Sequence, residues 1–187
     1  MNLHVLFPVL LFGAVSAGCA AVKVVEHTDT QNYYDGAFEY ATKDGKINTY
    51  IAGWPFAGKD AEEKFKNFVF SMMYGSTFGK NVNFKPSEPN SAKYGFHVVV
   101  TFNAVNNLSV GDICEDATQI KSQPNLKTTS MLSVFCQGAH PISYSRGYVA
   151  NLTGPDDPKL GSLVKGVALA MIPLYDDHHS ANDISPQ

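Results

Sequence analysis

The stretch YGFHVVVTF, residues 94–102, constrains the fold more than any other part of this 187-residue chain. Alternate side chains of a β-strand point to opposite faces of its sheet. One face of this stretch receives five apolar side chains: Tyr94, Phe96, Val98, Val100 and Phe102. The other face receives His97, Val99 and Thr101 and is also largely apolar. A strand that is apolar on both faces needs cover on both sides, so we expect it in the middle of a sheet. We expect His97 to be a hydrogen-bonded, partly buried ring rather than a metal ligand.

A helix is expected from residue 60 onwards. Four apolar residues there follow the i, i+3, i+4, i+7 spacing of one helical face: Phe65, Phe68, Val69 and Met72. Asp60 with Glu63 resembles a capping box, and Gly75 can adopt the left-handed conformation that ends a helix.

A second helix is predicted after GPDDP. Asp157 suits the N-cap and Pro158 suits the first turn, while Pro173 stops the helix. One apolar stripe follows the helical period between these ends: Leu160, Leu163, Val164, Val167, Ala168, Met171 and Ile172.

The remaining strands are predicted from shorter patterns. Asp44-Gly45 lies between two runs rich in aromatic and branched residues, which predicts a hairpin over residues 38–51. A short strand is expected within residues 81–93. Two β-rich runs, 129–138 and 142–152, are expected to pair through a turn at Gly138 and Pro141.

Together these elements predict an α+β fold. We expect an antiparallel sheet of five to six strands, with two amphipathic helices packed on one face. No internal repeat or second composition zone is present. One domain over residues 33–174 and a polar tail over 175–187 therefore account for the chain.

The N-terminus indicates export. No charged side chain occurs in residues 1–22, and an apolar run, 5–12, precedes small residues, as in a secretory signal peptide. SAGC, residues 16–19, resembles a bacterial lipobox, which implies a signal peptide over 1–18 and a lipid-modified, palmitate-bearing Cys19. Ala20 after the cysteine resembles Gram-negative lipoproteins of the outer membrane, with residues 20–32 as a tether to a domain that faces the periplasm.

Three other interpretations of the N-terminus remain open. Cleavage after Ala17 would release a soluble secreted or periplasmic protein. The uncharged stretch approaches the length of a membrane span. It is also compatible with a buried first strand or helix, although it has no polar face.

The two other cysteines form an even pair once Cys19 carries lipid. In an oxidising compartment we expect a Cys114–Cys136 disulfide, closing a loop of about 21 residues. The alternative is two buried thiols acting as small apolar side chains.

Three further segments carry a resemblance to a protein family. YIAGWPF, FCQGAHPIS and TGPDDPKLGSLVKGVALAMIP are similar to segments of uncharacterised envelope lipoproteins of alphaproteobacteria. The resemblance implies location and overall plan, namely a lipobox-type signal peptide plus a small periplasmic domain. It implies no activity.

Chemical motifs are sparse. A net charge of −3 and a pI near 6.0 give no reason to expect nucleic acid as a partner. The sequence has no nucleophile elbow, P-loop, HExxH or CxxC pair, and we expect no cofactor. The adjacent Asp156 and Asp157 are interpreted as helix capping rather than a Ca²⁺ site. His178 and His179 are weak metal candidates in the tail.

Three functions follow as hypotheses. The first is a non-enzymatic lipoprotein that binds an envelope protein partner, with Trp54 and Phe56 as a contact or, alternatively, a buried plug. The second is an envelope hydrolase with a pocket built from residues far apart in sequence: His97, His140, Arg146 and Asp156. The third is metal binding through His178 and His179.

Overall fold

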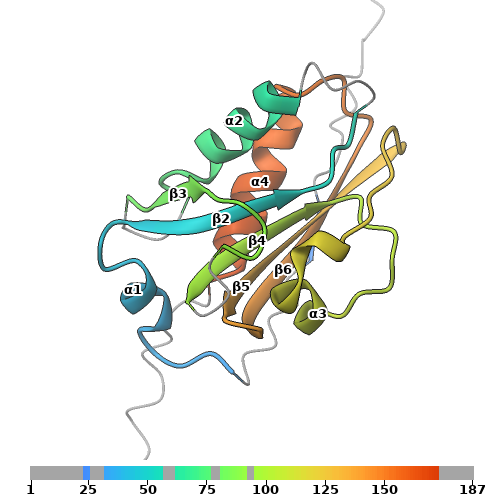
Figure 1. Cartoon of the computed structure of the whole chain (residues 1–187). Helices are drawn as coiled ribbons and strands as arrows, with labels where there is room; N and C mark the ends of the chain where they lie inside the picture. Colours follow the sequence, from blue (N-terminus) through green and yellow to red (C-terminus); the bar gives the residue numbers. More distant parts are fainter. Residues whose placement is uncertain (1–22, 26–31, 57–61, 77–80, 92–94, 173–187) are drawn as a thin grey trace, which may run out of the picture.

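A six-stranded sheet in the order β1-β6-β5-β4-β2-β3 organises the computed structural model (Figure 1). The structure describes residues 23–25, 32–56, 62–76, 81–91 and 95–172. The strands are β1 (Lys23–Val25), β2 (Lys46–Ala52), β3 (Asn83–Pro86), β4 (Phe96–Phe102), β5 (Thr128–Gln137) and β6 (His140–Ala150). The helices are α1 (Ala37–Ala41), α2 (Glu62–Met73), α3 (Val110–Glu115) and α4 (Pro158–Ala170), with a 3₁₀ turn η1 (Ala117–Gln119).

The predicted α+β class is confirmed, but the sheet is mixed. β1, β6, β5 and β4 form an antiparallel ladder, whereas β2 is parallel to both of its neighbours, β3 and β4. The expected antiparallel pairing therefore holds for most of the sheet but not for β2. The reason is topological: α2 returns the chain from the end of β2 to the start of β3, so the two strands run the same way.

The predicted hairpin at Asp44-Gly45 is also wrong. Its first half is the short helix α1, with Ala37 and Phe38 buried and Tyr40 exposed. The Thr42 hydroxyl donates to the Phe38 carbonyl at 2.7 Å and helps to close the helix. Gly45 has a φ of +71° and turns the chain into β2, so the Asp-Gly turn joins a helix to a strand.

One face of the sheet carries α2 and α4, as expected (Figure 1). Phe65, Val69 and Met73 of α2 are buried, and the predicted stripe of α4 is buried along its length. The two helices approach closely at Gly161, where an added Cβ would lie 3.0 Å from the sulfur of Met72. Gly75 has a φ of +68°, which confirms the predicted end of α2, whereas Asp60 lies outside the described residues.

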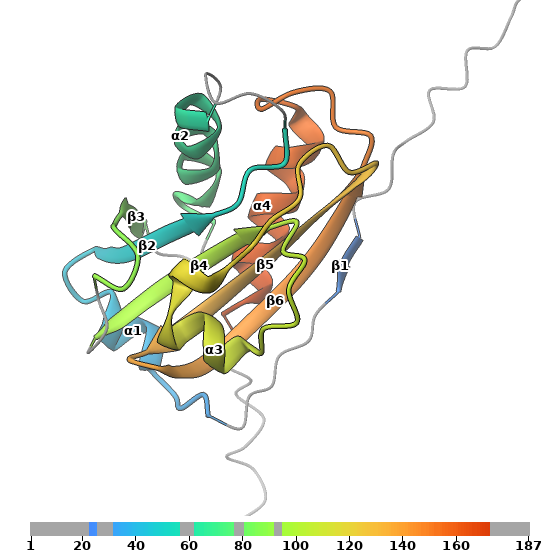
Figure 2. The same ribbon diagram turned by 45° about the vertical axis from the view of Figure 1, so that its right-hand side comes forward.

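The other face carries α3 and η1 over a smaller apolar cluster (Figure 2). β4 is covered on both sides, with Val98 facing the α2/α4 side and Val99 facing the α3 side. This confirms the prediction of a central strand. The β5–β6 hairpin is also confirmed, with Gly138 at a φ of +58° in the turn; Pro141 lies in β6 itself.

β1 changes the expected length of the tether. Residues 23–25 pair with β6 along register pairs from Lys23↔Tyr148 to Val25↔Arg146. These three residues therefore belong to the sheet and not to a tether over 20–32, and only four peptide units separate Cys19 from Lys23.

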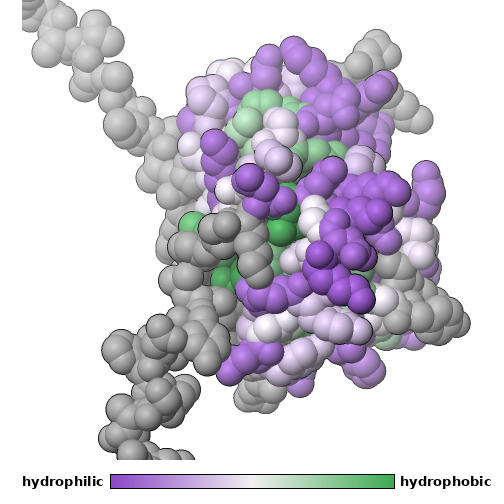
Figure 3. Space-filling view, turned by 90° about the vertical axis from the view of Figure 1, so that its left-hand side faces the viewer, coloured by the Kyte–Doolittle hydropathy of each residue, from purple (hydrophilic) through white to green (hydrophobic). Residues whose placement is uncertain are grey.

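The side of the molecule where β3 and α1 lie is largely hydrophilic, with small areas of hydrophobic residues among the polar ones (Figure 3). In the part of the chain that the structure describes, no helix has both the length and the apolar character needed to cross a bilayer.

Candidate functional site

A disulfide between Cys114 and Cys136 joins α3 to β5 beneath the smaller helical layer. The two Cα atoms lie 5.7 Å apart, and both residues are buried. The predicted pair is confirmed, and the alternative of two free thiols is wrong. Because α3 has only six residues, this bond holds a helix that could bury little apolar surface by itself.

His97 lies beside the disulfide, opposite Cys136 in the β4–β5 ladder. Its side chain is buried, and its Nδ1 lies 3.1 Å from the Gly95 carbonyl. Burial lowers the pKa of His97, although hydrogen bonds with the backbone of Gly95 and Cys114 oppose the shift. The predicted hydrogen-bonded ring is confirmed. Within the described ranges, no three His, Cys, Asp or Glu side chains are grouped as a metal site requires.

A cavity of about 330 Å³ opens on the same face, next to this cluster. Its floor is the sheet, and residues 104–108 form its rim. Arg146 and Tyr148 line it from β6, with Leu132 from β5 between them and β4. No carboxylate of the described residues lies within ion-pair distance of Arg146. The cavity therefore presents a guanidinium and a phenol hydroxyl that a ligand could contact.

Asn103 shapes the rim of this cavity. Its φ of +50° turns the chain out of β4, a conformation that asparagine tolerates better than most residues. Its side-chain oxygen accepts from the backbone N–H of Ser130 at 2.8 Å, and its backbone N–H donates to the Ser130 carbonyl at 3.0 Å. This rim and Tyr148 were not predicted from the sequence. The available signal was the polar run NAVNN directly after a buried strand.

The four residues named for a hydrolase pocket do not meet. Arg146 of β6 lies opposite Leu132 of β5, which in turn lies opposite Thr101 of β4. Thr101 is four residues along β4 from His97, a distance of about 13 Å at the rise of a strand. His140 is exposed at the first residue of β6, six residues along that strand from Arg146. Asp156 precedes α4 and pairs with Lys64 of α2 at 3.0 Å. The enzyme hypothesis therefore receives no site from these residues.

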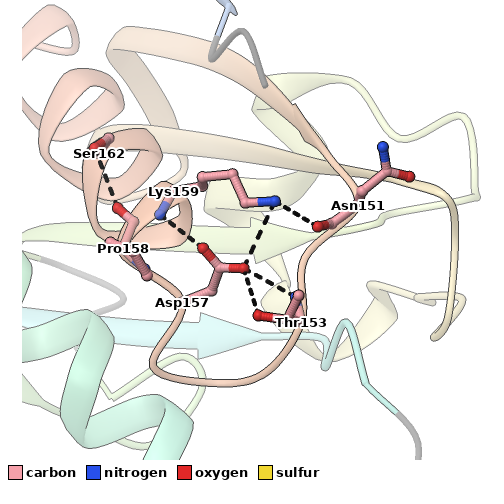
Figure 4. A network of polar contacts seen from close by, with 6 residues as sticks. All are labelled: Asn151, Thr153, Asp157, Pro158, Lys159 and Ser162. Atoms are coloured by element: carbon pink, nitrogen blue, oxygen red, sulfur yellow. Dashed lines mark hydrogen bonds and ion pairs between the residues drawn. The ribbon is translucent and has the colours of Figure 1, made fainter. Parts of the chain in front are cut away.

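Asp157 caps α4 at the centre of a polar network (Figure 4). One carboxylate oxygen accepts from the Lys159 amide at 2.8 Å, and the other accepts from the amide and hydroxyl of Thr153, each at 2.9 Å. Lys159 Nζ lies 3.7 Å from this second oxygen and donates to the Asn151 carbonyl. Burial raises the pKa of Asp157, but these hydrogen bonds and Lys159 outweigh it and hold the pKa below its ordinary value. This confirms the capping interpretation for Asp157, whereas Asp156 forms an ion pair with Lys64 of α2 instead.

Trp54 and Phe56 form the surface of an aromatic cluster. The Trp54 ring packs edge-on against Phe56 and Phe65, with centroid distances of 5.3 Å and 4.9 Å. Both residues are half-buried, so each retains an accessible part. A partner contact at Trp54 and Phe56 stays a prediction. Cys19, His178 and His179 lie outside the described residues.

Comparisons with known proteins include a distant likeness to a solved structure. The chain gives no match when compared with protein families or with curated proteins. Among solved structures, it is similar to a dodecamer of a PelC variant from Paraburkholderia phytofirmans, at 6% identity and a TM-score of 0.38. That likeness covers 81% of this chain and 97% of the other. The functional argument therefore rests on the residues described above.

Proposed function

We propose that this chain is an envelope lipoprotein, anchored in the outer membrane through Cys19, that acts in the periplasm by binding a partner protein. The observation that carries the proposal is the buried Cys114–Cys136 disulfide. Structural disulfides persist in oxidising compartments outside the cytosol. Together with the signal-like N-terminus and the lipobox resemblance, this bond favours an exported domain.

The position of β1 supports removal of a signal peptide. Cleavage before Cys19 would leave every described strand intact, because the first begins at Lys23. A diacylglycerol and an N-acyl chain on Cys19 would together give stable anchoring, since one acyl chain alone binds membranes only marginally.

The cavity beneath residues 104–108 supports the binding part of the proposal. It offers Arg146 without a carboxylate partner in the described part of the chain, and it has a polar rim that includes Asn106 and Asn107. A guanidinium in a concave site favours a carboxylate, which it can hold through two parallel hydrogen bonds. The chemistry therefore fits an acidic side chain of the partner protein.

The anchor is tested by labelling the full chain with radioactive palmitate during expression. Wild type should carry label and enter the detergent phase, whereas Cys19→Ala should do neither. The matched control is the double variant Cys114→Ala/Cys136→Ala, which also loses cysteines and should keep the label. Equal labelling of wild type and Cys19→Ala contradicts the proposal.

The binding surface is tested by photo-crosslinking in cells. A photoreactive residue at the exposed position Asn107 should give a specific adduct that weakens with Arg146→Gln. The same residue at Lys43, exposed on a different part of the molecule, serves as the control and should give no such adduct. Identical adducts from both positions, insensitive to Arg146→Gln, would show that the cavity is not the contact.

A further inference from the structure

We propose that three loops at one end of the sheet rest on an anionic phospholipid surface, the same surface that holds the acyl chains of Cys19. These anchor-end loops are residues 53–56, 103–105 and 121–127. The inference deepens the proposed function and rests on lipidation of Cys19.

The length of the chain determines which end of the domain lies near the anchor. β1 runs antiparallel to β6, from Lys23 opposite Tyr148 to Val25 opposite Arg146. The chain therefore enters β1 from the end of the sheet at which β6 finishes, at Ala150. Four residues span at most about 14 Å. A lipidated Cys19 thus keeps this end of the sheet close to the bilayer.

The anchor-end loops all leave the sheet at that end. β2 finishes before residue 53, β4 finishes before residue 103, and β5 starts after residue 127, opposite the last residue of β6. The Asn125 amide donates to the Pro55 carbonyl at 2.9 Å, and the Val105 amide donates to the Lys121 carbonyl at 3.0 Å. These bonds join the three loops into one surface. Figures 1 and 2 show the loop before β5 and the end of β2 at the same end of the molecule, away from α1.

The exposed apolar side chains divide between the two ends. At the anchor end, the aliphatic Val105 and Leu126 are 52% and 39% exposed, beside the half-buried Trp54 and Phe56. The other large exposed apolar residues of the described chain are three tyrosines near the opposite end: Tyr34, Tyr40 and Tyr74. Aliphatic side chains can enter the acyl region, and a tryptophan is suited to the interface above it.

The anchor-end loops themselves carry charge of one sign. The anchor-end loops contain Lys121 and Lys127 and no carboxylate, and neither lysine has an ion-pair partner among the described residues. The acidic residues of α3 and η1 lie toward the other end, where the disulfide fixes α3 near the end of β5: Asp112, Glu115 and Asp116. Anionic headgroups therefore attract these loops. The starts of α2 and α4, at the same end, also carry carboxylates, of which Glu62, Asp156 and Asp157 are paired with lysines.

The test uses the lipidated full chain in vesicles of phosphatidylglycerol and brominated phosphatidylcholine. Trp54 is the only tryptophan, so the variant Trp54→Phe has no tryptophan fluorescence of its own. Leu126→Trp in that background should lose about half or more of its fluorescence relative to vesicles without bromine, because bromine quenches on contact with the acyl region. The matched control, Tyr40→Trp in the same background, should be nearly unchanged.

Flotation of the vesicles separates this inference from the proposed function. Protein that carries no lipid and fails to float contradicts the lipoprotein proposal itself. Floating protein in which Leu126→Trp is unquenched, or less quenched than Tyr40→Trp, overturns the membrane contact and leaves the anchor intact.

A charge variant tests the role of the lysines. Lys121→Glu/Lys127→Glu should reduce quenching of Leu126→Trp in these anionic vesicles, and the effect should fade when phosphatidylglycerol is omitted. Lys43→Glu/Lys46→Glu, which makes the same charge change near the opposite end, is the control and should leave quenching unchanged. Equal effects of the two pairs contradict the proposed orientation.

Discussion

The two faces of the sheet are held by different means. On one face, α2 and α4 bury a continuous apolar layer that includes Phe65, Val69 and Leu163. On the other, α3 and η1 cover a small cluster around Val99 and Ile113, fixed by a disulfide. The α2/α4 face is stabilised by the apolar area that it buries. The second face, called the stapled face below, carries a short helix that is held by a disulfide and polar caps.

This difference explains where the cavity lies. α3 has six residues and covers the α3 face only near the Cys136 end of β5, so residues 104–108 must span the remainder. A rim made of a loop fills space less completely than a helix with an apolar stripe does. The cavity lined by Arg146 and Tyr148 thus lies on the face that carries α3 and the disulfide.

The largest predicted effect is on the α2/α4 face. Phe65→Ala removes a fully buried ring that meets Trp54 and Phe102 edge-on, each at a centroid distance of 4.9 Å. We expect the free energy of unfolding in urea to fall by about 3–5 kcal/mol. Tyr74→Ala, directly after α2 and 55% exposed, is the control and should change it little. Similar losses in both variants would show that this face is not the principal core.

The next effect tests the stapled face. Cys114→Ala/Cys136→Ala opens a loop closed across a sequence separation of 22, which the chain-entropy argument values at about 3 kcal/mol. Hydrogen exchange should rise first in α3 and η1 while the amides of α4 stay protected. Reduction of the wild type should give the same pattern. Equal loss of protection in α3 and α4 would contradict the separation of the two faces.

A smaller effect is expected where α4 begins. Asp157→Ala removes the acceptor of the Lys159 and Thr153 amides, and we expect a loss of stability of about 1–2 kcal/mol in thermal unfolding. Asp157→Asn keeps an acceptor and should recover part of the loss. Asp156→Ala, which removes only an exposed ion pair, should have a much smaller effect. A larger loss from Asp156→Ala than from Asp157→Ala would overturn the capping assignment.

The smallest effect is pH dependence on the stapled face. The pKa of His97 is lowered in the folded state, so the unfolded chain binds more protons below about pH 6.5. The contribution of His97 is therefore complete above that pH and declines as pH falls toward the folded-state pKa. Melting at pH 7.5 and 5.5 should show this loss in wild type and in the control His140→Gln, but not in His97→Gln. A loss that persists in His97→Gln assigns the dependence to other groups.

The sequence predicted the elements whose pattern is local. Spacing within one segment is enough to predict three features: the strand β4 with apolar side chains on both faces, the apolar stripe of α4, and the cap of α4 at Asp157. α1 was missed because the residues before Asp44 suit a strand as well as a single helical turn, and tertiary packing of Phe38 decides between them. The parallel pairing of β2 depends on how α2 packs, which no pattern within β2 records.

The candidate site was less predictable for the same reason. Cysteine counting found the disulfide, and the position of His97 in an apolar strand indicated its burial. The cavity combines Arg146 and Tyr148 with a rim some 40 residues earlier in the chain. Such a combination is set by strand register rather than by spacing, so only the folded arrangement shows it.

In the lipoprotein that we propose, β1 gives the tether between Cys19 and the domain two lengths. While its three residues stay paired with β6, four peptide units join Cys19 to Lys23, and the sheet lies within about 14 Å of Cys19. β1 is a short edge strand, and such elements open at far lower free energy than a core. Once β1 detaches, the 13 peptide units from Cys19 to Asn32 allow a reach of about 45 Å. In the proposed lipoprotein, three backbone pairings thereby set how far from the membrane the domain can act.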